Sequence, residues 1–258
     1  MPDNSPFRLD GKQVLVTGAG GGIGHALVAA FRTAGARVSG ADRGNVPLSA
    51  LALEHELVTD LGDVAATHRA VRSYLDSHGT PDVVVSNAGY TRAETLENLD
   101  VDVWQSELAV NLSGAYALTA PIVDAMAARG SGAVIFISSV NGLAHYGNPA
   151  YSAAKAGLIA YAKAIAVERG SRGIRANVVC PGSVRTPAWD HRLAADPGLL
   201  AKVLPHYPLG RLVTPEEVAN AVVFLASPAA AGITGIAMAV DAGLTAGNLR
   251  FIDDVLRG

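Results

Sequence analysis

The sequence predicts an α/β protein in which one parallel sheet carries helices on both faces. Short apolar runs alternate with segments of helical periodicity along all 258 residues. We find no linker, internal repeat or low-complexity tract between them. Strands that alternate with helices form a doubly wound parallel sheet, so we expect residues 1–258 to be a single domain.

Seven apolar runs are the expected strands, and six of them are followed by a polar residue or a turn. The strands are Val14–Val16, Arg37–Ala41, Glu56–Thr59, Val83–Ser86, Ala133–Ile137, Arg175–Val179 and Ile236–Val240. Ligands of an open parallel sheet bind beyond the carboxyl ends of its strands. We therefore expect one edge to gather Gly18, Asp42, Asp60, Asn87, Ser138 with Ser139, and Pro181 with Gly182.

Six segments between and after these strands are expected to be helices. They are Gly22–Ala34, Val64–His78, Val101–Arg129, Pro149–Arg169, Pro187–Val203 and Pro215–Ala226. Alternation of this kind places the helices on both faces of the sheet.

A glycine-rich turn joins the first strand to the first helix. It reads Thr17-Gly18-Ala19-Gly20-Gly21-Gly22-Ile23-Gly24. A helix N-terminus offers free backbone N–H groups and a positive dipole end, and glycines let a pyrophosphate approach closely. The position directly after the first strand favours a dinucleotide site over a flexible loop. The plain G-x-G-x-x-G pattern is not met, because Ile23 stands where the third glycine would be.

Tyr151 and Lys155 are four residues apart in a segment predicted to be helical, so their side chains share a face. The pKa of a free phenol is about 10. A nearby ammonium favours the phenolate and lowers that pKa. The pair is therefore predicted to be a general acid/base tuned toward neutral pH.

Composition narrows the class of function. A net charge of −3 and the absence of a basic patch with interleaved aromatic residues argue against nucleic acid as a partner. The single Cys180 excludes an intrachain disulfide and suits a reducing, cytoplasmic setting. The chain has neither the apolar core of a signal peptide nor a run of roughly 18 apolar residues, so no membrane partner is expected. Its histidines form no metal-ligand pair, and we expect no metal site.

Several motifs together resemble the short-chain dehydrogenase/reductase family along nearly the whole chain. They are Thr17-Gly18-x-x-x-Gly22-Ile23-Gly24, Asn87-Ala88-Gly89, Val110-Asn111-Leu112-Ser113-Gly114, Ile137-Ser138-Ser139, Tyr151-x-x-x-Lys155, Cys180-Pro181-Gly182-Ser183-Val184-Arg185-Thr186 and Val240-Asp241-Ala242-Gly243. Two positions depart from the family pattern: Ser86 replaces the usual Asn, and Ala242 replaces the usual Gly.

The resemblance implies a Rossmann-type fold and an oxidoreductase that transfers a hydride between NAD(P) and a secondary alcohol or ketone. It also implies the catalytic residues Asn111, Ser139, Tyr151 and Lys155. In oxidation, Tyr151 would remove the alcohol proton while Ser139 donates to the substrate oxygen. Lys155 would hold the phenolate and hydrogen-bond the nicotinamide ribose, and Asn111 would hold a water that links Lys155 to solvent.

The cofactor residues carried over from the family come from several of these motifs. They are Gly18, Gly22, Ile23, Gly24, Asp42, Arg43, Asp60, Leu61, Asn87, Ala88, Gly89, Tyr151, Lys155, Pro181, Gly182, Val184 and Thr186. A carboxylate at Asp42 can accept hydrogen bonds from the adenosine ribose and repels a 2′-phosphate. Arg43 is the counter-argument, because a guanidinium pairs well with phosphate. Asp42 lies nearer the strand end, so we expect NAD rather than NADP, and Asp60 is expected to contact the adenine.

Two alternatives stay open within the family. Gly21 also satisfies T-G-x-x-G-x-x-G, the spacing of a longer branch of epimerases and dehydratases, whose additional substrate region this length does not accommodate. The second concerns the serine. The motif Ser-x-x-Gly selects Ser139, whereas Ser138 keeps the commoner spacing to Tyr151. Neighbouring strand side chains point to opposite faces, so only one can serve, and we favour Ser139.

Substrate selection is expected in a lid at residues 183–212. Its Trp189 and His191, with His145, Ser139 and Tyr151, are the expected substrate contacts. Polar rings suggest a sugar, polyol or hydroxy acid. A 3-oxoacyl-type reductase and a non-catalytic dinucleotide-binding regulator on the same fold are the alternatives. By resemblance, the segments Val101–Arg129 and Pro149–Arg169 are expected to assemble a homodimer or homotetramer.

Overall fold

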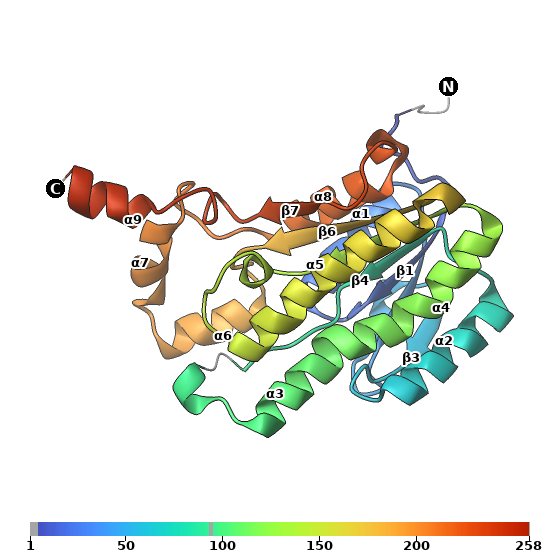
Figure 1. The fold of residues 1–258 in the computed structure, drawn as a ribbon, viewed down its shortest axis with the longest axis horizontal. Helices are drawn as coiled ribbons and strands as arrows, with labels where there is room; N and C mark the ends of the chain where they lie inside the picture. The colour runs from blue at the N-terminus through green and yellow to red at the C-terminus, as the bar shows by residue number, and fades with distance from the viewer. Residues whose placement is uncertain (1–4, 93–94, 258) are drawn as a thin grey trace.

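The computed structural model describes residues 5–92 and 95–257. A seven-stranded sheet with the order β3-β2-β1-β4-β5-β6-β7 forms its centre (Figure 1), and every pair of neighbouring strands is parallel. The predicted parallel α/β fold is confirmed. The strands are β1 (Gln13–Thr17), β2 (Arg37–Asp42), β3 (Glu56–Val58), β4 (Val83–Ser86), β5 (Gly132–Ile137), β6 (Ile174–Pro181) and β7 (Ala237–Val240).

Helices connect the strands and cover both faces of the sheet (Figure 1). The α-helices are α1 (Gly22–Thr33), α2 (Val64–His78), α3 (Val101–Leu108), α4 (Gly114–Arg129), α5 (Pro149–Arg169), α6 (Pro187–Ala195), α7 (Leu199–Val203), α8 (Pro215–Ala226) and α9 (Leu249–Phe251). Two π-helical segments are η3 (Ala109–Ser113) and η8 (Ile252–Leu256). Short 3₁₀ turns are η1 (Ser49–Leu51), η2 (Leu96–Asn98), η4 (Val140–Gly142), η5 (Gly170–Arg172), η6 (Leu204–His206) and η7 (Pro228–Ala230).

Two of the predicted helices are each divided in the structure. The expected helix Val101–Arg129 contains the π-helical segment η3 between α3 and α4. The expected helix Pro187–Val203 ends at Ala195, and α7 starts only at Leu199. Pro197 explains this correction, because a proline disfavours helical geometry in the residue before it. Asp196 is indeed extended, with φ −134° and ψ 90°.

Two hydrophobic cores lie on opposite faces of the sheet, because strand side chains alternate between faces. Val14 and Val16 of β1 join the core that contains α1 and α8. Leu15, between them, joins the core that contains α2, α4 and α5. The sheet is thus buried on both sides.

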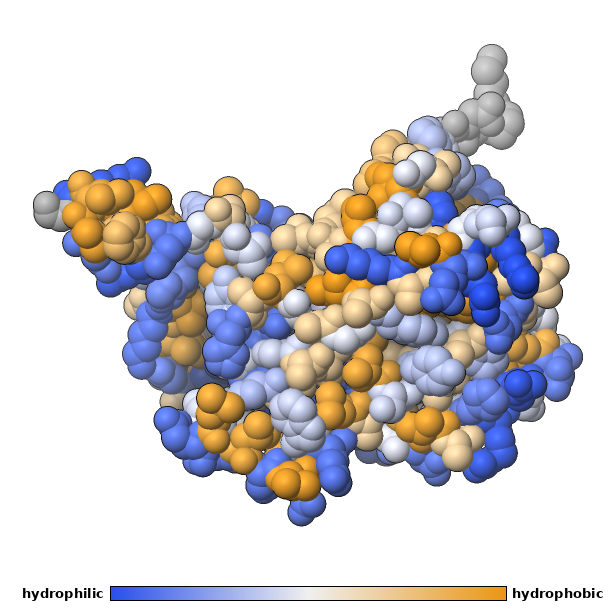
Figure 2. All heavy atoms as spheres, in the orientation of Figure 1, coloured by the Kyte–Doolittle hydropathy of each residue, from blue (hydrophilic) through white to orange (hydrophobic). Residues whose placement is uncertain are grey.

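The carboxyl ends of β6 and β7 point toward the side of the molecule where α6 and α7 lie (Figure 1). The segment predicted to be a lid therefore lies at the expected edge of the sheet. Beyond β7, α9 and η8 project away from the body of the molecule (Figure 1), and hydrophobic residues gather on this extension (Figure 2). Its exposed apolar side chains include Phe251, Val255 and Leu256. Within the described residues, no helix has the length and apolarity needed to cross a membrane.

Candidate active site

The glycine turn after β1 is a closely packed backbone cradle. Gly18 has a φ of +64°, a conformation that L side chains rarely adopt. A Cβ at Gly24 would overlap the carbonyl oxygen of Gly18, and one at Gly22 would lie 2.8 Å from Cγ2 of Thr186. The missing side chains let the turn, α1 and the loop before α6 meet.

The N-terminus of α1 is suited to an anionic group. No side chain caps it, so the first-turn N–H groups, those of Gly22, Ile23 and Gly24, have no partner within the helix. These groups and the helix dipole favour a phosphate at this position. The cradle therefore fits the pyrophosphate of a dinucleotide.

Asp42 at the end of β2 faces this turn. Its Oδ2 accepts a hydrogen bond from Gly20 N at 3.0 Å, and its Oδ1 accepts one from Arg43 N at 2.8 Å. The Arg43 side chain is exposed. A carboxylate and a guanidinium are thus both near the place where the dinucleotide ribose is expected.

Two further loops of the expected cofactor site are held by internal hydrogen bonds. Asn87 Nδ2 donates to Thr17 O at 2.9 Å, and Thr17 Oγ1 accepts from the N–H groups of Asn87 and Ala88. Asp60 is exposed, and its Oδ1 accepts from Gly62 N at 2.9 Å. Leu61 is buried, and its backbone lies against Gly114 at the start of α4. Thr17, which was not among the expected site residues, joins the loops after β1 and β4.

Tyr151 and Lys155 lie on one face of α5, as their spacing predicts. The Lys155 Nζ is 5.3 Å from the centroid of the Tyr151 ring and donates to the carbonyl oxygen of Ile137 at 2.9 Å. Lys155 is buried, whereas Tyr151 is partly exposed. The phenol can therefore meet a substrate that the amine cannot reach directly.

The two candidate serines face different surroundings. Ser139 forms a side-chain hydrogen bond with Tyr151. Ser138 Oγ donates to the carbonyl oxygen of Lys155 at 2.8 Å, and its side chain is buried. Of the two hydroxyls, only that of Ser139 lies beside the phenol.

Burial opposes ionisation of both members of the pair. It raises the pKa of Tyr151 to about 12, although the hydrogen bond with Ser139 acts in the opposite direction. It lowers the pKa of Lys155 to about 8. The expectation of a phenol pKa tuned toward neutral pH therefore does not hold for the protein alone, because desolvation outweighs the opposing effect of Ser139.

Asn111 lies in the π-helical segment η3, and its side chain is buried. Its Oδ1 accepts from Tyr90 N at 3.2 Å, and its Nδ2 donates to the carbonyl oxygens of Tyr90 and Glu107, both at 2.9 Å. A Cβ at Gly89 would lie 3.2 Å from the Lys155 Nζ and closer still to the Asn111 Oδ1. Gly89 thus permits Asn111 and Lys155 to approach each other.

The loop after β6 is the last of the loops at the carboxyl edge of the sheet that carry expected cofactor residues. Gly182 N donates to Val240 O at 3.1 Å, and Val184 forms a parallel bridge with Val213. Pro181 and Val184 are buried, and Thr186 lies against Gly22. This loop and the glycine cradle therefore adjoin at the carboxyl edge of the sheet.

Comparisons with known proteins agree with this geometry. The sequence model described as enoyl-(acyl carrier protein) reductase matches residues 18–245. An oxidoreductase structure from Burkholderia thailandensis, described as a member of the short chain dehydrogenase/reductase family, is similar with a TM-score of 0.89 and 42% identity, covering 96% of this chain and 98% of that one. The chain belongs to the short-chain dehydrogenase/reductase family. It is accordingly an oxidoreductase that acts on CH–OH groups.

Relatives within the family have different substrates in their names. D-threitol dehydrogenase of Mycolicibacterium smegmatis is 36% identical, with 93% of this chain and 95% of that protein covered. The 3-oxoacyl-[acyl-carrier-protein] reductase of Thermotoga maritima is also 36% identical, with 92% and 99% covered. A gluconate 5-dehydrogenase structure from Burkholderia cenocepacia, in complex with NADP and tartrate, has a TM-score of 0.87 and 30% identity, covering 94% and 98%.

The expected substrate contacts of this family member differ in exposure. His145 and His191 are exposed at the surface. Trp189 is 8% exposed, belongs to the core on the α1 and α8 side, and has the Arg192 guanidinium 4.7 Å above its ring. Trp189 therefore packs against the core, and its expected contact with the substrate stays a prediction.

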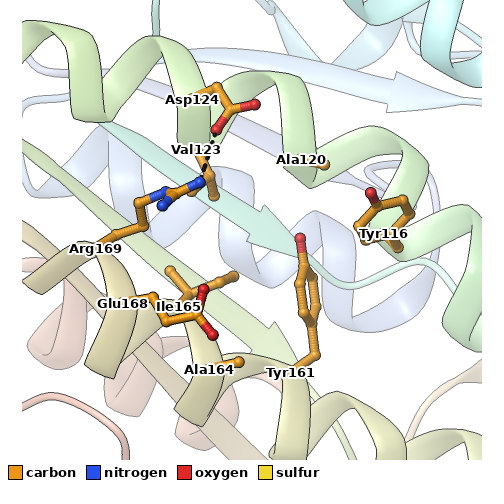
Figure 3. Close-up of a pocket in the computed structure, with 9 residues that line it drawn as sticks. All are labelled: Tyr116, Ala120, Val123, Asp124, Tyr161, Ala164, Ile165, Glu168 and Arg169. Atoms are coloured by element: carbon orange, nitrogen blue, oxygen red, sulfur yellow. Dashed lines mark hydrogen bonds and ion pairs between the residues drawn. The ribbon is translucent and has the colours of Figure 1, made fainter.

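One hollow lies away from this edge, between α4 and α5 (Figure 3). It measures about 170 Å³ and is lined by Tyr116, Tyr161 and the Arg169–Asp124 ion pair, among others. None of these residues belongs to the catalytic group. In the described part of the chain, no cluster of His, Cys, Asp or Glu side chains could hold a metal ion.

Proposed function

We propose that this chain interconverts a secondary alcohol and a ketone, with Tyr151 as the proton-transfer group and Ser139 as the hydrogen-bond donor to the substrate oxygen. The observation that carries the proposal is the placement of the partly exposed Tyr151 between Ser139 and the buried Lys155, at the sheet edge that also bears the glycine cradle. A bound nicotinamide supplies the hydride acceptor in oxidation and the hydride donor in reduction.

Tyr151 handles the proton of the reaction. In oxidation, the alcohol O–H bond breaks and its proton passes to the phenolate; in reduction, the phenol returns a proton to the carbonyl oxygen. Ser139 donates a hydrogen bond to that oxygen where negative charge develops. Lys155, held by Ile137 O, presents its amine behind the phenol.

The pKa of Tyr151 determines how each direction responds to pH. Because the pKa is raised to about 12, the phenol is protonated at neutral pH in the protein alone. Reduction needs this protonated form, whereas oxidation needs the phenolate. We expect kcat/KM for alcohol oxidation to rise between neutral and alkaline pH, and kcat/KM for ketone reduction not to rise with it.

The choice between NAD and NADP rests on Asp42 and Arg43. The Asp42 carboxylate at the glycine turn supports NAD, since it would repel a 2′-phosphate. The exposed Arg43 and the NADP found in the similar gluconate 5-dehydrogenase structure support NADP equally. We propose NAD because the Asp42 carboxylate lies directly at the glycine turn. Comparison of kcat/KM for the two cofactors tests the assignment, and an advantage for NADP would overturn it.

The proposed substrate class is a polyol, sugar or sugar acid. Similarity to a D-threitol dehydrogenase and to a gluconate 5-dehydrogenase with bound tartrate supports it. The exposed His145 and His191 offer polar groups for hydroxyls. The competing candidate is a 3-oxoacyl-type reductase, which the similarity to the Thermotoga maritima enzyme supports.

A substrate panel separates these two candidates. Tetritols, pentitols and sugar acids are tested for cofactor reduction, and a 3-oxoacyl thioester is tested for cofactor oxidation. Greater kcat/KM for a hydroxylated substrate supports the proposal. Turnover of the thioester alone would replace it with the acyl reductase.

Substitutions in the lid and at His145 then test where substrate selection occurs. His145→Ala and His191→Ala should change the KM for the substrate or the preference over its analogues. Trp189→Ala should instead lower stability, because it empties a core position. If both histidine variants keep the wild-type substrate profile, selection lies elsewhere.

A further inference from the structure

Glu107 is a buried carboxylate that the proposed reaction does not use. It lies in the last turn of α3 and is only 2% exposed. None of the ion pairs between described residues includes it. A buried carboxylate is costly unless hydrogen bonds compensate it, so its place beside the catalytic group needs a reason.

The hydrogen bonds of Glu107 and Asn111 hold one backbone segment. Glu107 Oε1 accepts from Arg92 N at 2.9 Å. One helical turn later, Asn111 bonds both the N–H and the carbonyl oxygen of Tyr90. Residues four apart lie on one helix face, so the two side chains hold alternate residues of the segment after β4.

This segment continues directly from Gly89, which lies between Asn111 and Lys155. A Cβ at Gly89 would be 3.2 Å from the Lys155 Nζ. Tyr90 is held further by its hydroxyl, which donates to Ser106 Oγ at 2.9 Å. Movement of Tyr90–Arg92 would therefore disturb the backbone that packs against the lysine.

The charge of Glu107 also affects the pKa of the Tyr151 hydroxyl. Besides burial, three groups act on the pKa of that hydroxyl: Ser139 after β5, Glu107 of α3 and Cys180 of β6. The Nζ of Lys155, on the same helix, lies 5.3 Å from the centroid of the tyrosine ring. Among the three groups, the negative charge of Glu107 adds to the increase in the pKa of Tyr151, after burial. The carboxylate thus has both a structural and an electrostatic connection to the pair.

We propose that Glu107 is a positioning residue for the Tyr151–Lys155 pair: its carboxylate anchors Tyr90–Arg92 to α3 and presents a negative charge to the Tyr151 hydroxyl. The inference rests on the proposed function in one respect only, because that function assigns the proton transfer to Tyr151. Both connections can be measured without a substrate.

Glu107→Gln and Glu107→Leu separate the two roles. Glutamine keeps an acceptor for Arg92 N and removes the charge, whereas leucine removes both. Glu168→Gln is the matched control, because Glu168 is an exposed carboxylate on the same helix as Tyr151.

The first measurement is a ¹⁹F NMR titration of protein labelled with 3-fluorotyrosine, which ionises at lower pH than tyrosine. Loss of a signal in Tyr151→Phe assigns the Tyr151 resonance. We expect Glu107→Gln to lower its midpoint, by on the order of one pH unit or less, and Glu168→Gln to leave it in place. An unchanged midpoint in Glu107→Gln would overturn the electrostatic role.

The second measurement is hydrogen exchange at the Tyr90 and Arg92 amides. Exchange should be faster in Glu107→Leu and remain near wild type in Glu107→Gln. Equal protection in all variants would overturn the anchoring role. If leucine prevents folding, the glutamine titration still decides the electrostatic role, and exchange in Glu107→Ala replaces the leucine measurement.

Kinetics connect the two results to turnover. Glu107→Leu should reduce kcat more than it changes the KM of the substrate, and Glu107→Gln should restore most of kcat while moving the pH profile of oxidation to lower pH. Wild-type protein that turns over no alcohol or ketone would refute the proposed function and leave the titration and exchange results standing. A profile that does not move in an active Glu107→Gln enzyme would refute the inference alone.

Discussion

At the scale of single residues, Lys155 combines burial with a charge. Burial lowers its pKa from 10.5 to about 8 in the folded protein. Between these two values the unfolded chain binds a proton that the folded protein does not, so stability rises with pH there. Below about pH 8 the full cost of the buried charge is present.

Lys155→Met should therefore make the protein more stable at pH 7 while abolishing turnover. We expect a gain on the order of 1 to 3 kcal/mol, reduced by the lost hydrogen bond to Ile137 O. The gain should shrink as pH approaches 10. Urea unfolding at several pH values measures it, with the exposed Lys163→Met as the control. A stability loss at pH 7 that is independent of pH would contradict this account.

The serine and tryptophan show how far residue types and spacing can predict a site. Spacing and family motifs predicted Tyr151, Lys155 and Ser139 as members of one site. They could not exclude Ser138 as the catalytic serine, because the orientation of neighbouring side chains depends on how the strand ends. Burial of Trp189 could not be predicted, since an aromatic ring in a lid can face either the core or the substrate. Glu107 carried no signal at all, because a glutamate in a helix is normally solvated.

At the scale of elements, the turn from β1 to α1 is the most constrained part of the cofactor site. Gly24→Ala would place a Cβ onto Gly18 O, so the turn must open. Cofactor binding should be lost or weakened at least about tenfold, which corresponds to about 1.4 kcal/mol. Gly247→Ala is the control, because nothing lies within 4 Å of its added Cβ. Calorimetric titration with NAD and NADP measures the effect, and unchanged affinity in Gly24→Ala would place the cofactor elsewhere.

Elements were predicted well where apolar periodicity is long and less well where a local break intervenes. All seven strands overlap their predicted ranges, and α2, α5 and α8 match theirs. The break at Pro197 was readable from proline stereochemistry. The π-helical turn around Asn111 was not, because α4 buries residues on most of its sides, so a shift of one residue leaves no visible change of phase in the apolar pattern.

At the scale of the whole molecule, we propose that α4 and α5 form the contact between subunits, as the family resemblance suggested. Tyr116 is 55% exposed, Val167 is 82% exposed, and the hollow in Figure 3 lies between the two helices. Val167→Glu should then lower the oligomeric state, because it places a charge in an apolar contact. The control is Val58→Glu, on the edge strand β3. Light scattering coupled to size-exclusion chromatography measures the molar mass of the assembly. An unchanged mass in Val167→Glu would contradict this contact.

In the proposed reaction, hydride transfer at this edge of the sheet depends on Tyr151 as the proton-transfer group. The most direct test of this dependence is nicotinamide reduction by wild type and Tyr151→Phe across the panel of polyols and sugar acids, with Tyr161→Phe as a control on the same helix. We expect turnover by the wild type and by Tyr161→Phe. Tyr151→Phe should be slower by at least about 10²–10⁴-fold, with cofactor affinity retained. Turnover near the wild-type rate in Tyr151→Phe would contradict this dependence.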